Sequence, residues 1–323
     1  MSFRNKTNIC ISSLKDLFRC ISLASLLEVS GWPKPGNVHR TKDFENTRYE
    51  HFLASISAIQ PCFYEFCFNI FKNYTDRDQD FQFVGLGDFY IKAAKVMMKW
   101  QNGGNVLLGH ILLLSPLVAA ATISLNQKQL RLKNFEDNLE KIIQDATVED
   151  TINLYKAIRI CNPGGLGKIE KYDITDQDSV KELKEDNISL RKIFKLSASY
   201  DSISYEYANG FKIILEMGLP YYLEKYDQTH DINITTVDTF LKLLSEVPDT
   251  LISRKLSEKE ALDVSKKAEK ILKKGGISTR EGLKLTKKLD LTMHSHKGRM
   301  NPGTTADLLS AVIFMALLLG IRF

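Results

Sequence analysis

The chain has 323 residues, of which 44% are hydrophobic and 26% are charged, a balance typical of a globular protein with a large buried core. Its net charge of +5 suits anionic small molecules but is too weak to indicate a nucleic-acid-binding protein. The five cysteines form no C-x-x-C pair, which argues against a disulfide framework or a zinc site. With no secretion-signal pattern in the first residues, we expect a cytoplasmic protein.

The first predicted element is an amphipathic helix that ends near Ser30. Its apolar stripe consists of Leu14, Leu17, Phe18, Ile21 and Ala24, which recur at helical spacing. Glu28 falls on the same stripe. Its carboxylate therefore needs a partner or a ligand, because an unpaired buried charge is costly.

A proline-rich turn, residues 31–36, follows this helix. Its two prolines fix their own φ angles and bias the preceding residues towards extended backbone, so the turn holds Lys34 in a defined place. The basic residues that follow are His39, Arg40 and Lys42. A carboxylate, a rigid lysine and a basic cluster in so short a span suit a polyphosphate or a metal–phosphate complex. The alternative is an ordinary helix end with solvated charges.

The rest of the chain is predicted to be helical nearly throughout. We expect helices over residues 49–72, from an N-cap at Asp88 to Trp100, and over 106–123, 131–160, 194–217, 237–251, 257–274, 280–291 and the terminal run. Minor strands are expected only in 76–86 or 168–180. The sequence therefore predicts an all-α fold of about ten or more helices in a single domain, residues 1–323.

Two of these helices are strongly apolar. The run 106–123 contains Pro116, which should kink it. The run 308–321 is about fourteen residues long, shorter than the roughly twenty that a membrane-spanning helix needs. We interpret both as core helices, and a membrane-inserted protein is the alternative.

Loops rich in glycine or asparagine are the next candidates for chemistry. In the first, Asn105 follows two glycines and can cap the next helix, whose N-terminal N–H groups would form an anion site. His110 in that helix is either a core residue or a ligand. The second loop, residues 162–168, does not match a P-loop and is either a surface turn or a flexible cover for a ligand.

The third loop, residues 301–308, reads Asn-Pro-Gly-Thr-Thr-Ala-Asp-Leu and leads into the last apolar helix. Thr304 and Asp307 have capping-box spacing, so they either only start this helix or present polar groups at the edge of a ligand cleft. An acidic residue there could hold a divalent cation bound to phosphates. Just upstream lie three polar residues that we interpret as loop residues without metal-site spacing, with contact to substrate as the alternative, namely Asp290, His294 and His296.

These motifs resemble those of the triphosphoribosyl-dephospho-CoA synthase family. The opening motif is Leu-Glu-Val-Ser at 27–30 followed by Pro-Lys-Pro-Gly-Asn-Val at 33–38, and the closing motif is Pro-Gly, two small residues and Ala-Asp-Leu at 302–308. The family's acidic loop residue is matched by Asp43. The resemblance spans about residues 14–318 and rests mainly on these two motifs.

Two internal segments also resemble the family. Asn105 and Gly109 match an internal motif, although Val-Leu-Leu at 106–108 departs from its usual polar and basic residues. Asp249 and Thr250 lead to Arg254 as in a family segment. These three residues either pair with each other or contact phosphate, and pairing is the simpler interpretation.

The resemblance implies an enzyme that transfers a triphosphoribosyl group from ATP to the 2′-hydroxyl of 3′-dephospho-CoA and releases adenine, making a prosthetic-group precursor. It implies Mg²⁺ on the triphosphate, with Glu28 and Asp307 as catalytic carboxylates and metal ligands. The residues it places at ATP or the acceptor are Lys34, Pro35, Gly36, His39, Asp43, Asn105, Gly109, Arg254, Asn301, Gly303 and Thr304. We expect no nucleic-acid or membrane partner, and the oligomeric state is left open.

Two rival hypotheses stay open. The departure at 106–108 and the charged segment 170–192 suit the same glycosyl transfer to a different acceptor in another cofactor pathway. Alternatively, the chain is a non-catalytic helical protein that only binds a nucleotide. Tyr205, Glu206 and Asn209 lie in a predicted helix that either lines the cleft or carries them as exposed polar residues, and exposure is the simpler interpretation.

Overall fold

The computed structural model describes residues 8–75 and 80–323, and these residues contain fifteen α-helices and no strand. The predicted all-α fold is thereby confirmed. The strand expected in 168–180 is wrong, because Asp173 and its neighbours bond locally: its carboxylate accepts from the N–H groups of Ile169 and Thr175 at 3.1 and 2.7 Å. The other expected strand, 76–86, lies partly outside the described residues, and its described part holds a 3₁₀ turn.

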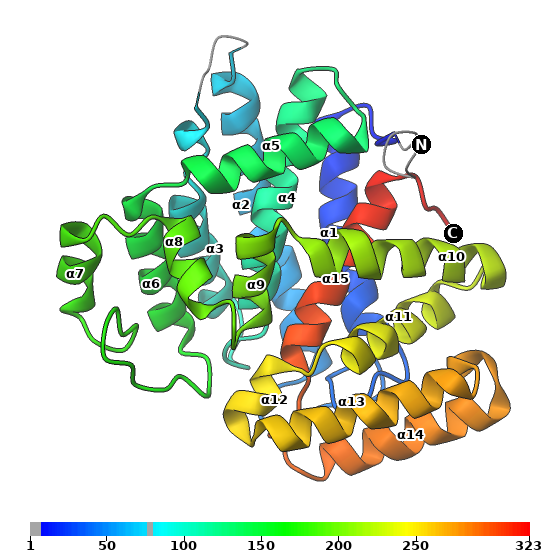
Figure 1. Cartoon of the computed structure of the whole chain (residues 1–323). Helices are drawn as coiled ribbons and strands as arrows, with labels where there is room; N and C mark the ends of the chain where they lie inside the picture. The colour runs from blue at the N-terminus through cyan, green and yellow to red at the C-terminus, as the bar shows by residue number, and fades with distance from the viewer. Residues whose placement is uncertain (1–7, 76–79) are drawn as a thin grey trace.

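Helices α1 to α15 follow one another along the chain, with long connections between α1 and α2 and between α6 and α7 (Figure 1). They are α1 (Leu14–Ser30), α2 (Tyr49–Asn73), α3 (Leu86–Lys99), α4 (Leu108–Asn126), α5 (Leu132–Asp145), α6 (Val148–Cys161), α7 (Ser179–Glu185), α8 (Leu190–Ser197), α9 (Ser202–Asn209), α10 (Leu219–Thr229), α11 (Ile232–Glu246), α12 (Thr250–Lys255), α13 (Glu258–Lys273), α14 (Arg280–His294) and α15 (Gly303–Leu318). Single helical turns of other types are η2 (Gln82–Val84), η3 (Ile213–Gly218, a π-helix) and η4 (Gly276–Ser278).

The two strongly apolar helices, α4 and α15, cross the centre of the molecule and pack on each other. Nearly every residue of both is buried. By length and composition α4 could cross a membrane, but 94% of its apolar window is buried inside the protein. The prediction of two core helices is therefore confirmed, with Pro116 inside α4.

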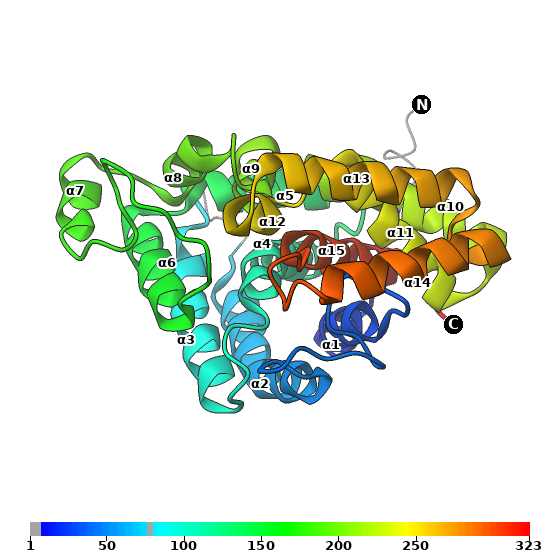
Figure 2. The same ribbon diagram turned by 90° about the horizontal axis from the view of Figure 1, so that it is seen from below.

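The remaining helices cover this central pair from several sides. Helices α1, α2, α3 and α5 pack on α4, whereas α1, α10 and α11 pack on α15. Figure 2 shows α3 and α6 on one side of the molecule and α13 and α14 on the other, with α4 and α15 between them. This arrangement brings the C-terminal end of α1 to the N-terminal ends of α4 and α15.

Several helices differ from those predicted. The single helix expected over 131–160 is divided into α5 and α6, and the helix expected over 237–251 is α11, which begins and ends five residues earlier. Helix α3 begins at Leu86 after Gly85, whose φ of +60° turns the chain, so Asp88 lies in the first turn and is not the N-cap. The single helix expected over 194–217 is divided into α8, α9 and η3. Asp201 starts α9 by accepting from the Ser204 N–H at 2.9 Å, and Gly210 ends it at a φ of +71°.

Glu206 is buried, so its interpretation as an exposed helix residue is wrong. Its carboxylate accepts from the backbone N–H groups of Ile213 and Ile214, each at 2.9 Å, and thereby holds the start of η3. Burial raises its pKa to about 8, against the smaller lowering effect of these two hydrogen bonds. The folded protein therefore favours the protonated form of Glu206.

The raised pKa predicts a pH dependence of stability. Glu206 contributes fully below its ordinary pKa of 4.5, and this contribution is lost as the pH rises through about 8. We expect the free energy of unfolding of the wild type to fall more steeply over this interval than that of Glu206→Gln, measured by urea denaturation. Parallel pH profiles would show that Glu206 has an ordinary pKa in the folded chain.

Close packing of α3 on α6 gives a second prediction. A Cβ added at Gly87 would lie 2.5 Å from the Cα of Asp150 and 2.8 Å from its carbonyl oxygen, so two backbones would have to separate. Gly87→Ala should cost about 1–3 kcal/mol of stability, the usual range for overpacking. The matched control is Gly167→Ala, whose Cβ would meet nothing within 4 Å. Equal thermal midpoints for the two variants would contradict the close contact.

Candidate active site

A pocket of about 1240 Å³ opens where α1, α4 and α15 meet. Helices α6, α8, α9, α12 and α14 and the loops 42–47 and 163–169 complete its wall. Nine of the predicted site residues line it, namely Glu28, Asp43, Asn105, Gly109, Arg254, Asn301, Gly303, Thr304 and Asp307. The pocket therefore brings together residues from both ends of the chain.

Glu28 and Lys34 form a buried ion pair at the inner end of the pocket. The Lys34 amine bonds to Oε1 of Glu28 and also donates to the Glu28 carbonyl oxygen at 2.6 Å. Burial raises the pKa of Glu28 and lowers that of Lys34, although each charge opposes the shift of the other. Lys34 does not itself line the pocket, so the structure places it behind Glu28.

Asp307 is the second carboxylate of this inner end. The Nε2 atom of His110 lies between the two acids, 3.5 Å from Oε2 of Glu28 and 3.6 Å from Oδ1 of Asp307. A Cβ at Gly109 would lie 1.9 Å from Oδ2 of Asp307, so only glycine allows this approach. Burial first, and then the Glu28 charge, raise the pKa of Asp307 well above its ordinary value.

His110 lines the pocket and is also part of its inner packing. Burial, together with the nearby Lys34 charge, lowers the pKa of His110 to about 3, so its imidazole is neutral near pH 7. Its Nδ1 atom lies 3.1 Å from the Ser25 hydroxyl. The sequence left His110 as either a core residue or a ligand, and its position in the pocket wall beside both carboxylates is compatible with either role.

The N-terminus of α15 is not held by the predicted capping box. Its N-cap is Pro302, whose side chain cannot accept a hydrogen bond. Asp249, at the start of α12, supplies the missing acceptor. Asp249 accepts from the N–H and the hydroxyl of Thr305 at 2.7 and 2.8 Å, and from two N–H groups of α12. Asp307 is thereby left to face the pocket.

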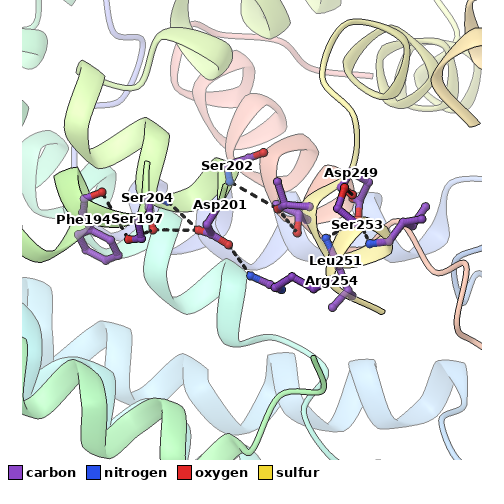
Figure 3. Close-up of polar contacts among 12 residues, drawn as sticks. Phe194, Ser197, Asp201, Ser202, Ser204, Asp249, Leu251, Ser253 and Arg254 are labelled. Carbon is purple, nitrogen blue, oxygen red and sulfur yellow. Dashed lines mark hydrogen bonds and ion pairs between the residues drawn. The ribbon is translucent and has the colours of Figure 1, made fainter. Parts of the chain in front are cut away.

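Arg254 does not pair with Asp249 or Thr250, so that part of the prediction is wrong. Its Nη1 atom lies 2.6 Å from Oδ2 of Asp201, on the segment between α8 and α9 (Figure 3). Both residues line the pocket. No local sequence pattern indicated this pair, because the two residues are 53 positions apart.

The proline-rich turn is anchored by Asp290 of α14. This carboxylate accepts from the Gly36 N–H at 3.0 Å and lies 3.3 Å from Nε2 of His39 and 2.9 Å from Nδ1 of His294. Burial would raise the pKa of Asp290, but the hydrogen bonds from His294 and His39 outweigh it and lower the pKa. Pro35, Gly36 and His39 are buried and do not line the pocket.

His294 is the last residue of α14 and lines the pocket, so it was wrongly interpreted as a loop residue. Because its Nδ1 faces Asp290, this nitrogen is the hydrogen-bond donor. Its Nε2 is buried without a hydrogen-bond partner in the described part of the chain. The i, i+4 spacing of Asp290 and His294 was the available sequence signal.

The pocket wall divides by chemistry. Its basic side chains are Lys42, Lys171, Arg254, Lys255 and Lys297, whereas α6 and α8 contribute the apolar residues Leu154, Tyr155, Ile158, Ile193 and Phe194. Asn105 is not the predicted N-cap of α4, which is Leu107, but its side chain accepts from the Leu108 N–H at 3.1 Å at the start of that helix. Such a wall suits a ligand with an anionic part and a flat or apolar part.

The buried ion pair gives a stability prediction. Lys34→Met should lower the free energy of unfolding by about 3–5 kcal/mol, because it leaves the Glu28 carboxylate buried without its partner. Adding Glu28→Gln should restore part of this loss. The control is Lys92→Met, which breaks an exposed pair with Glu65 and should cost about 1 kcal/mol or less. Equal losses in urea denaturation would contradict the assignment.

Comparisons with known proteins agree on one family. The family model for ATP:dephospho-CoA triphosphoribosyl transferase matches residues 14–322. A protein of Acinetobacter calcoaceticus, named a probable 2-(5''-triphosphoribosyl)-3'-dephosphocoenzyme-A synthase, is 30% identical over 110 residues, which cover 34% of this chain and only 37% of that relative. A crystal structure of a candidate triphosphoribosyl-dephospho-CoA synthase from Archaeoglobus fulgidus has a TM-score of 0.62 and 25% identity, covering 85% of this chain and 100% of that one. This chain belongs to the ATP:dephospho-CoA triphosphoribosyl transferase family, a family of transferase enzymes.

Proposed function

We propose that this protein transfers the triphosphoribosyl group of ATP to the 2′-hydroxyl of 3′-dephospho-CoA in the cytoplasm and releases adenine. The observation that supports this most directly is the layout of one pocket, which has two carboxylates at its inner end and basic side chains elsewhere on its wall. The basic residues suit the triphosphate. The carboxylates suit the positive charge that develops on the ribose.

In this reaction the bond between ribose C1′ and the adenine nitrogen breaks, and its electron pair leaves with adenine. The acceptor oxygen forms the new bond to C1′, and its proton ends on adenine. Glu28 and Asp307 are the side chains that we assign to the reacting carbon, where one carboxylate stabilises the oxocarbenium-like state and the other accepts the hydroxyl proton. Burial raises the pKa of both groups, which favours a carboxyl that can take up a proton.

The inner carboxylates also fit Mg²⁺. Magnesium is usually held by one or two carboxylates together with substrate phosphates, which matches Glu28 and Asp307. Burial raises the pKa of both groups, and the Glu28 charge raises that of Asp307 further, so a divalent cation held by these carboxylates would favour their ionised forms. When bound, Mg²⁺ would neutralise the triphosphate oxygens.

A different acceptor is the second candidate. Val106 and Leu108 line the pocket in the segment where the family resemblance expects polar and basic residues. An apolar wall there removes charged contacts that an anionic acceptor would use. Glycosyl transfer from ATP to a less polar alcohol therefore remains an alternative to dephospho-CoA.

Adenine release tests this proposal. Purified protein would be incubated with ATP and Mg²⁺, with and without dephospho-CoA, and adenine and the enlarged CoA product measured by chromatography and mass spectrometry. We expect Glu28→Gln and Asp307→Asn to reduce adenine release by about 10²–10⁴-fold, the usual contribution of a catalytic acid or base. The control is Glu65→Gln, which changes an exposed carboxylate on α2.

Each alternative has its own result. Adenine that appears only with another alcohol would support the second candidate. Bound ATP without adenine under any acceptor would indicate a non-catalytic nucleotide-binding protein. Full activity in a folded Glu28→Gln variant would remove Glu28 from the mechanism.

A further inference from the structure

Asp201 and Arg254 form an ion pair in the wall of the pocket. Arg254 is 29% exposed and Asp201 is 14% exposed, and they join Nη1 to Oδ2 at 2.6 Å. The other Asp201 oxygen, Oδ1, accepts from the N–H and hydroxyl of Ser204 and so caps α9 (Figure 3). Oδ1 of Asp201 therefore caps α9, whereas Oδ2 binds Arg254.

A second cation lies next to this pair. Lys255 also lines the pocket, and its Nζ atom contacts only a carbonyl oxygen, that of Gly298, at 3.4 Å in the described part of the chain. The loop 163–167 packs closely on both cations: a Cβ at Gly165 would lie 3.1 Å from Cβ of Arg254, and one at Gly164 would lie 3.3 Å from Cε of Lys255. Arg254 and Lys255 therefore form a compact cationic subsite beneath a loop.

We propose that Arg254 and Lys255 bind the polyphosphate chain of the substrate, and that Asp201 is a competitor for Arg254 built into the pocket. The identity of the anion rests on the proposed function. A guanidinium binds phosphate oxygens as it binds carboxylate oxygens, by charge-assisted hydrogen bonds, and Asp201 occupies the Nη1 side of Arg254. A polyphosphate that binds this side of the guanidinium therefore competes with Asp201 and weakens the Asp201–Arg254 contact.

A competitor of this kind has a use in a reaction that transfers the triphosphoribosyl group. The triphosphate stays on the transferred ribose, so substrate and product present the same anion to Arg254. Binding that is equally strong before and after the reaction does not accelerate the chemical step and delays product release. A carboxylate that pairs again with Arg254 would lower the affinity for both substrate and product and shorten the time that the product stays bound.

The opposite role for Asp201 is a positioning one, in which its bond orients Arg254 for phosphate. The two roles predict opposite signs for the same substitution. Asp201→Asn keeps an oxygen to cap α9 but removes the charge that Arg254 binds. A competitor, once removed, should strengthen polyphosphate binding, whereas the loss of a positioning group should weaken it.

The test is calorimetric binding of inorganic tripolyphosphate to the full chain without Mg²⁺, so that the inner carboxylates hold no cation. We expect Asp201→Asn to bind about five- to tenfold more tightly than the wild type, and Arg254→Gln at least about tenfold more weakly. The double variant should match Arg254→Gln, because the competitor has no effect once its target is gone. Circular dichroism would confirm that each variant is folded.

Asp231→Asn is the matched control. Asp231 caps α11 by accepting from the Ile234 N–H at 2.8 Å, as Asp201 caps α9, but it does not line the pocket. We expect it to leave tripolyphosphate binding unchanged. An equal gain in affinity from Asp231→Asn would show a general charge effect and overturn the proposal.

Two other results would also overturn it, namely unchanged or weaker binding by Asp201→Asn, and no tripolyphosphate binding by the wild type. Failure of the proposed function would look different. Tripolyphosphate binding that responds to Asp201→Asn as expected, combined with no adenine release from ATP, would reject the proposed reaction and keep the polyphosphate subsite.

Discussion

The burial of two carboxylates beside each other is the constraint on which the site depends. Glu28 and Asp307 come from opposite ends of the chain, and their charges are unfavourable in an apolar environment. The protein tolerates them because α4 and α15 form a nearly all-apolar centre, whose packing offsets the cost of a few charged groups at its edge. The Lys34 amine compensates one of the two acids directly.

The segment between α1 and α2 holds the Lys34 amine next to Glu28. Lys34 can reach Glu28 because the turn after α1 folds back, and the turn is fixed at its far end by Asp290 of α14. Asn233 of α11 bonds the backbone of Trp32 at both its N–H and its carbonyl oxygen. Contacts with two distant helices therefore hold a loop that has no regular secondary structure, which keeps the buried lysine from relaxing towards water.

Sequence patterns predicted most of the helices because the apolar stripes carry a helical period, and the two core helices because they have no polar face. Glu28 and Asp307 were predictable for a related reason: each is an acid within or beside apolar sequence. Asp201 and Asp249 were not, because their partners lie 53 and 56 residues away and a helix-capping aspartate looks the same with or without such a partner. The direction of the Lys34 amine also depends on contacts that its local sequence does not encode.

The separation of charge within the pocket bears on how a nucleotide would lie in it. Without a bound cation, a triphosphate is repelled by Glu28 and Asp307 and attracted by Arg254 and Lys255, so the two groups of side chains act on one molecule with opposite sign. The favourable orientation places the phosphates on the cations and the ribose towards the carboxylates. Because Asp201 adds to the raised pKa of Asp307, the two regions are electrostatically linked. The Arg254 guanidinium offsets the Asp201 charge and thereby also influences the protonation of Asp307. The proposed chemistry needs one carboxyl at this inner end that can take up a proton.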